Sequence, residues 1–119
     1  MTLDHIQLAI PANEEAKARA FYGDLLGLQE IEKPEPLEAR GGCWFQVGIQ
    51  QLHLGVEAEF RPAKKAHPAF RVKDYGDLQK RLRQVGFGVT PDNMLGDIVR
   101  FYTHDPFGNR LEFIKEIGS

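Results

Sequence analysis

The chain has 119 residues, of which 42% are hydrophobic and 27% charged, and its formal net charge at pH 7 is −2. This length suits one small domain, and the composition is typical of a globular protein in water. The charge excludes the basic surface of a nucleic-acid-binding protein, and the apolar runs are too short to span a bilayer. We therefore expect a small-molecule substrate or another protein chain as the partner, with no nucleic acid and no membrane.

Cysteine usage and the N-terminal residues bear on the compartment. The single cysteine, Cys43, cannot form a disulfide within the chain, which is typical of a reducing environment. The first residues include Asp4 and lead directly into a strand-like pattern, so no secretory signal is expected. These features predict a cytoplasmic protein.

The first half of the sequence alternates between strand and helix patterns. Residues 3–10 predict a strand with His5 on one face. Asn13 is a suitable N-cap for a helix over 14–26, and Gly27 suits the end of that helix. Further strands are predicted at 28–31, 44–47 and 51–56, with a loop over 33–42.

The second half repeats this order after a polar linker. A strand is predicted at 66–72, then a helix that Asp74 can cap and that ends before position 86, then strands at 87–90, 98–103 and 109–115. Asp105 to Gly108 predict a tight turn before the last strand. In that strand Leu111 and Phe113 share one face, and Glu112 points to the other.

The two halves also share an internal spacing. Gly27 precedes His53 by 26 residues, and Gly86 precedes Glu112 by the same number. Such a repeat indicates two copies of one supersecondary unit.

The repeat predicts the fold class. Units of about 55 residues are too small to bury a good core alone, so they should pair. We expect an α+β fold of two paired βαβββ modules whose sheets curl into a cup. The single domain would span 1–119, with module one at 1–57, a linker at 58–65 and module two at 66–119.

Four side chains fall on equivalent faces of the predicted strands: His5, His53, His67 and Glu112. The opposite face of each sheet is apolar and can be covered by the helix of its unit. Neutral imidazole nitrogen and carboxylate oxygen suit a divalent cation such as zinc, nickel, manganese or iron. The pattern therefore predicts one divalent metal ion held by these four residues.

Each of these residues also has a structural interpretation. A lone histidine in a strand is more often a hydrogen-bonded structural residue, and Glu112 would face solvent on a one-sided sheet. The matched positions of three of the chain's four histidines favour the metal site. The fourth, His104, is expected to be exposed.

Other side chains of the central strands have two possible roles. Trp44 and Tyr102, like their neighbours Phe45 and Phe101, can form an apolar substrate wall or pack in the core. Arg71 and Arg100 are cations in mid-strand that could lie on the face of the candidate ligands.

Three segments together resemble a known family. They are His5-Ile-Gln-Leu-Ala-Ile, Ala20-Phe-Tyr-Gly-Asp-Leu-Leu-Gly-Leu28 and Asp105-Pro-Phe-Gly-Asn-Arg-Leu-Glu-Phe113. They are similar to those of the vicinal oxygen chelate superfamily, which holds glyoxalase I, fosfomycin-resistance thiol transferases, extradiol dioxygenases and bleomycin-resistance proteins. The resemblance covers essentially the whole chain and implies paired βαβββ modules with a metal in the cupped sheet.

The resemblance also implies roles for the candidate residues. His5, His67 and Glu112 match the His-His-Glu ligand set of the dioxygenases and fosfomycin enzymes, and His53 stands where bacterial glyoxalase I has a glutamate. The expected protein is a metal-dependent glyoxalase-like lyase, isomerase or transferase. It would chelate a substrate through neighbouring oxygens and stabilise an oxyanion, with Glu112 or His53 as the catalytic proton-transfer group.

Two alternatives remain at this point. One is an extradiol-type dioxygenase, and the other is a metal-free protein that sequesters a ligand, like the bleomycin-resistance proteins. Because modules of this family pair within a chain or swap between chains, a homodimer is the expected assembly.

Overall fold

The chain consists of two units that each contain one four-stranded sheet. The computed structural model describes residues 1–117. The chain divides between Ala63 and Lys64, within the segment predicted as a linker. None of the helices in residues 1–117 combines the length and the apolar character needed to cross a bilayer.

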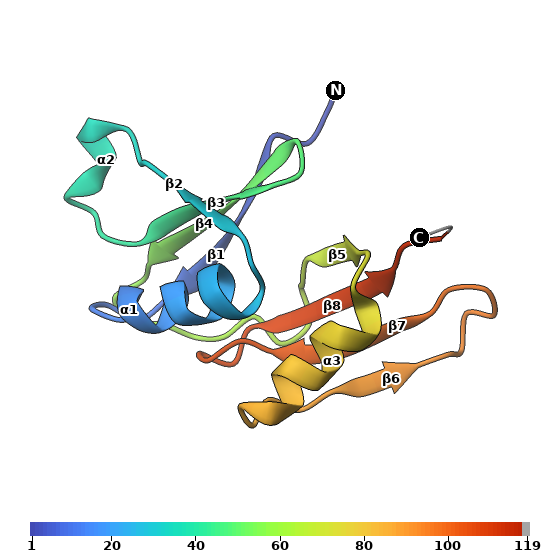
Figure 1. Cartoon of the computed structure of the whole chain (residues 1–119). Helices are drawn as coiled ribbons and strands as arrows, with labels where there is room; N and C mark the ends of the chain where they lie inside the picture. The colour runs from blue at the N-terminus through green and yellow to red at the C-terminus, as the bar shows by residue number, and fades with distance from the viewer. Residues whose placement is uncertain (118–119) are drawn as a thin grey trace. The chain divides into compact units, whose positions relative to one another are not determined.

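The first unit has the order β-α-β-β-β, with one added helical turn (Figure 1). Its elements are β1 (His5–Ile10), α1 (Glu15–Ala18), η1 (Arg19–Leu25), β2 (Gln29–Ile31), α2 (Glu35–Glu38), β3 (Cys43–Val47) and β4 (Gln50–Val56). The strands lie in the order β1-β4-β3-β2. β1 runs parallel to β4, and the other two pairs are antiparallel.

The second unit repeats this arrangement. Its elements are β5 (Ala69–Val72), α3 (Tyr75–Gln84), β6 (Thr90–Asp92), β7 (Arg100–His104) and β8 (Arg110–Lys115). The strand order is β5-β8-β7-β6, again with the first and last strands of the unit parallel. The predicted α+β fold with a repeated βαβββ unit is therefore confirmed.

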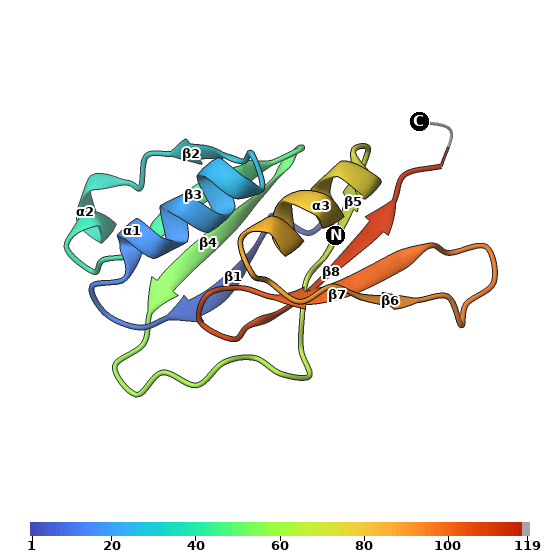
Figure 2. The same cartoon turned by 60° about the horizontal axis from the view of Figure 1, so that its bottom comes forward.

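In each unit the helical segment covers one face of its own sheet (Figure 2). The side chains between helix and sheet are apolar and almost fully buried. In the first unit they include Phe21, Tyr22, Phe45, Leu52 and Leu54, and in the second Leu78, Leu82, Phe101, Leu111 and Phe113. Phe45 and Phe101 are thus core residues, and the polar positions that alternate with the buried ones lie on the uncovered face.

The first helix differs from its predicted form. Asn13 has a φ of 64° and is not the N-cap, because the helix begins one residue later, after Glu14. From Arg19 onward the helix is a π-helix, in which the Leu26 amide donates to the Phe21 carbonyl at 2.9 Å. The wider turn lets the consecutive residues Phe21 and Tyr22 both enter the core.

Three other segments differ from the sequence-based prediction. The loop over 33–42 contains the short helix α2, which Pro36 favours because its fixed φ suits a first helical turn. β5 begins at Ala69, so His67 lies just before the strand. β6 lies at Thr90–Asp92 rather than at 87–90, because the Phe87 amide donates to the Leu82 carbonyl and closes α3 instead.

The turn before β8 has the predicted form. The Asp105 carboxylate accepts from the backbone amides of Phe107 and Asn109, both at 2.9 Å. Gly108 has a φ of 94°, which a residue with a Cβ rarely adopts. This turn fixes where β8 starts and hence the face to which Glu112 points.

Candidate functional site

Three aromatic rings stack on the uncovered face of the first unit. Trp44 in β3 lies opposite His53 in β4, and their rings are 3.6 Å apart and 3° from parallel. The His5 ring from β1 lies over His53 at 4.0 Å. The pairing of β1, β4 and β3 therefore holds the His53 imidazole against two rings.

Hydrogen bonds select the free nitrogen of each histidine in this stack. His53 Nε2 lies 2.9 Å from Gln51 Oε1, which only accepts, so Nε2 carries the proton and Nδ1 keeps its lone pair. His5 Nδ1 donates to the Asp4 carboxylate at 2.8 Å, which leaves Nε2 as the basic nitrogen. Burial, followed by the proximity of His5, lowers the pKa of His53. The neutral ring, which can bind a metal ion or take up a proton, is favoured.

A histidine and a glutamate meet on the corresponding face of the second unit. Glu112 in β8 is 5% exposed, and its Oε1 lies 2.8 Å from His67 Nε2. His67 Nδ1 lies 3.0 Å from the Lys65 carbonyl, which only accepts, so Nδ1 carries the proton. In the neutral ring two lone pairs then face each other across 2.8 Å. This contact requires a shared proton or a cation.

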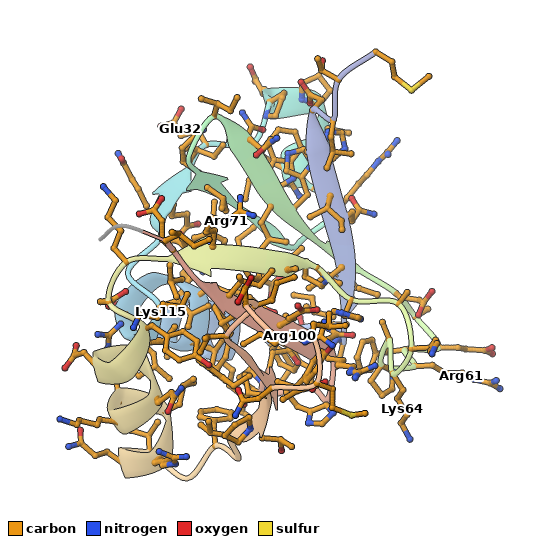
Figure 3. The ribbon with its side chains drawn as sticks, turned by 90° about the vertical axis from the view of Figure 1, so that its right-hand side faces the viewer. Glu32, Arg61, Lys64, Arg71, Arg100 and Lys115 are labelled. Carbon is orange, nitrogen blue, oxygen red and sulfur yellow. The ribbon has the colours of Figure 1, made fainter. Side chains whose placement is uncertain are left out.

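Arg100 lies on the other side of Glu112. Its Nη1 donates to Glu112 Oε2 at 3.3 Å, and its Nη2 donates to Asp92 Oδ2 at 3.0 Å. The Met94 backbone amide, and then Arg100, lower the pKa of Asp92. Figure 3 shows Arg100 among the strands of this unit, whereas Arg61 extends outward from the linker. Arg100 thus links the carboxylates of Glu112 and Asp92 through one guanidinium.

Comparison with known proteins identifies the family. Residues 2–113 match the model of the Glyoxalase/Bleomycin resistance protein/Dioxygenase superfamily. The chain belongs to this superfamily. The resemblance of three sequence segments to this superfamily is therefore confirmed.

Individual proteins are also similar to the chain. A solved structure of a protein from Bacillus anthracis, described as of the glyoxalase family, is 49% identical, with a TM-score of 0.93 over 98% of this chain and 95% of that one. "Glyoxylase I 4" of Arabidopsis thaliana is 27% identical over 93% of this chain and 68% of its own length. The structure of the oxidase ChaP-H2 is 25% identical, with a TM-score of 0.72 over 100% of this chain and 97% of that one.

The donor atoms fit the divalent metal that superfamily members commonly use. His67 Nε2 and Glu112 Oε1 converge with their lone pairs, and His5 and His53 each keep one basic nitrogen. These are borderline donors suited to a first-row divalent ion. Within residues 1–117, no three His, Cys, Asp or Glu side chains lie close enough together to hold a metal ion.

The structure brings the predicted residues together in two pairs, His5 with His53 and His67 with Glu112. Glu112 is buried, so the alternative interpretation, in which it faces solvent on a one-sided sheet, is wrong. His104 is exposed, as expected. Trp44 and Tyr102 lie on the candidate face, where Tyr102 packs edge-on against His67 with ring centroids 5.5 Å apart.

Two contacts of the site were not predicted from the sequence. One is the stack of Trp44 on His53, and the other is the bridge that Arg100 makes between Glu112 and Asp92. The sequence indicated only that Arg71 and Arg100 are mid-strand cations that could lie on this face. Asp92, the partner of Arg100, was assigned to a loop, so this bridge required the pairing of β6 with β7.

Proposed function

We propose that the protein is a metal-dependent enzyme of this superfamily, a lyase, isomerase or transferase that acts on a small substrate with neighbouring oxygen atoms. The observation that carries the proposal is the His67–Glu112 contact. With His67 neutral, two lone pairs face each other at 2.8 Å in this part-buried pair, an arrangement that suits the ligands of a cation. The membership of the chain in a superfamily that contains glyoxalases supports the same conclusion.

His5, His53, His67 and Glu112 are the proposed ligands of one divalent ion, which is zinc, nickel, manganese or iron. Such an ion supplies Lewis-acid stabilisation of an oxyanion on the substrate. The single domain over 1–119 and a homodimer in the cytoplasm remain part of this proposal.

Side chains of the protein itself would accept the proton that is transferred in the reaction. Burial lowers the pKa of His53, so its neutral ring could accept a proton at Nδ1 when that nitrogen is not bound to the metal ion. Gln51 holds the ring through Nε2, and Trp44 fixes its plane. On the second unit, Glu112 is the alternative proton acceptor, and Arg100 keeps its second oxygen oriented.

An oxygen-dependent reaction is the second candidate. The observation in its favour is the likeness over the whole chain to a protein described as an oxidase, at 25% identity. The His-His-Glu donors are also those of non-haem iron enzymes. Oxygen uptake by the iron-reconstituted protein in the presence of catechols distinguishes this reaction from the first proposal.

Metal content is the experiment that tests the proposal. Untagged wild-type protein and the variants His5→Ala and Glu112→Ala are reconstituted with each of the four metals, dialysed and analysed by atomic emission. We expect about one equivalent per chain in the wild type and a loss in both variants, because each removes a direct ligand.

His104→Ala is the matched control, since it removes an exposed imidazole that is not a proposed ligand. It should retain the metal. Wild-type protein that binds no metal above background, while both ligand variants remain as stable as the wild type, would refute the enzyme proposal. That result would leave the ligand-sequestering alternative.

A further inference from the structure

A hollow of about 230 Å³ lies in the first unit beside the histidine stack. Trp44 forms part of its wall, while the same indole stacks on His53. The rest of the lining comes from β1, from β4 and from the segment around α2, which connects β2 to β3 (Figure 1). A molecule in this hollow therefore contacts the residue that holds His53 in place.

The charge of the lining is positive. Lys33 and Arg40 are among the lining residues, and no acidic side chain is. Lys33 Nζ donates to the Gly41 carbonyl, so part of its hydrogen-bonding capacity is used. Arg40 is exposed, and in the described residues no carboxylate is paired with it. Its guanidinium can therefore form a bidentate bond to a carboxylate ligand.

The remaining lining is suited to a flat apolar group. Trp44, Leu37 and Val56 provide apolar surface, and Gly55 has no side chain. The Gln7 amide lies over Gly55, so that a Cβ at position 55 would be 3.0 Å from Gln7 Nε2. The volume equals that of roughly eight water molecules, which limits the occupant to a small molecule or the end of a larger one.

We propose that this hollow binds the carboxylate-bearing end of a small substrate with a planar apolar part, with Arg40 as the residue that recognises the carboxylate. The proposal rests on the proposed function, because it makes the hollow the specificity pocket of the same site. The planar part would lie against Trp44, and the reacting end of the substrate would then be near His53.

Trp44 is the only tryptophan of the chain, so its fluorescence reports on the hollow. The full-length protein is titrated with benzoate and, separately, with benzyl alcohol, and the Trp44 emission is followed. We expect a saturable change with benzoate and a much weaker one with the neutral alcohol. Arg40→Gln should weaken benzoate binding about fivefold, the effect of one charge-assisted bond at an exposed position.

Arg61→Gln is the matched control, because it removes the same charge from the linker, outside the lining of the hollow. It should leave benzoate binding unchanged. Equal binding to wild type and Arg40→Gln, or equal loss in Arg40→Gln and Arg61→Gln, overturns the proposal. Thermal melts of both variants confirm that each is folded.

Glu112→Ala separates this proposal from the proposed function. Benzoate binding that depends on Arg40 and persists in Glu112→Ala assigns the carboxylate to the hollow, whether or not the protein binds metal. Binding that disappears in Glu112→Ala and is unaffected by Arg40→Gln assigns the carboxylate to the metal instead. In that case the hollow proposal fails and the metal-dependent enzyme stands.

Discussion

Replacing Gly42 with alanine should destabilise the first unit strongly. Gly42 has a φ of 84°, and a Cβ at this position would lie 2.0 Å from the Leu54 carbonyl oxygen and 3.1 Å from its carbon. Both atoms are backbone, so the start of β3 would have to move away from β4. The Gly42 amide also donates to Glu15 Oε2 at 2.7 Å, and this bond would be strained.

The expected cost can be worked out from these contacts. A left-handed φ costs a residue with a Cβ about 1–2 kcal/mol. Loss of the bond to Glu15 adds about 1 kcal/mol, and backbone displacement to relieve the overlap adds about 1–3 kcal/mol. The total is about 3–6 kcal/mol, a large part of the stability of a small protein.

Gly27→Ala isolates the steric contribution. Gly27 has a similar φ, 79°, but nothing lies within 4 Å of its Cβ position, so only the cost of about 1–2 kcal/mol applies. Urea denaturation followed by circular dichroism measures both variants. Equal free energies of unfolding for Gly27→Ala and Gly42→Ala would show that the contact with Leu54 carries no cost and that the reasoning is wrong.

Three further predictions concern charge and reactivity. The hydrogen bond from the Gly42 backbone amide lowers the pKa of Glu15. The ionised Glu15 therefore contributes stability above its unfolded-state pKa, and this contribution is lost as the pH falls through the folded-state pKa. The difference in free energy of unfolding between wild type and Glu15→Gln, measured by urea denaturation, should be largest near neutral pH and shrink in acid. Burial raises the pKa of the Cys43 thiol to about 11, so native protein at pH 8 should react with a disulfide reagent far more slowly than unfolded protein; equal rates would contradict its burial. Arg100→Gln should lower the melting temperature more than the exposed Arg83→Gln, since it removes the guanidinium that bridges Glu112 and Asp92, and equal melting temperatures would mean that the bridge carries no stability.

Strand alternation was the feature that sequence analysis could use best. Leu111 and Phe113 are buried against α3 and Glu112 lies opposite them, because a period of two in the sequence is also the period of the strand. The same reasoning placed His5 and His53 on one face of the first sheet, where their rings are stacked.

Features that depend on a particular hydrogen bond or strand register could not be derived in this way. The π-helical turn depends on a bond between Leu26 and Phe21, which a pattern of 3.6 residues does not contain. Asp92 looked like a loop residue until its register with Arg100 placed it in β6. The assignment of the four ligands to one metal ion stays a prediction, tested by the metal analysis.

The parallel pairing of the first and last strand of each unit has a consequence for folding. His67 and Glu112 are 45 residues apart in sequence, and they meet only when β8 aligns with β5. This contact closes a loop almost as long as the unit itself. Because closing a long loop costs conformational entropy, the contact should form late in folding. During synthesis the candidate ligands therefore remain apart until the final strand of their unit is complete. A truncated chain would expose single donor groups without forming a binding pair.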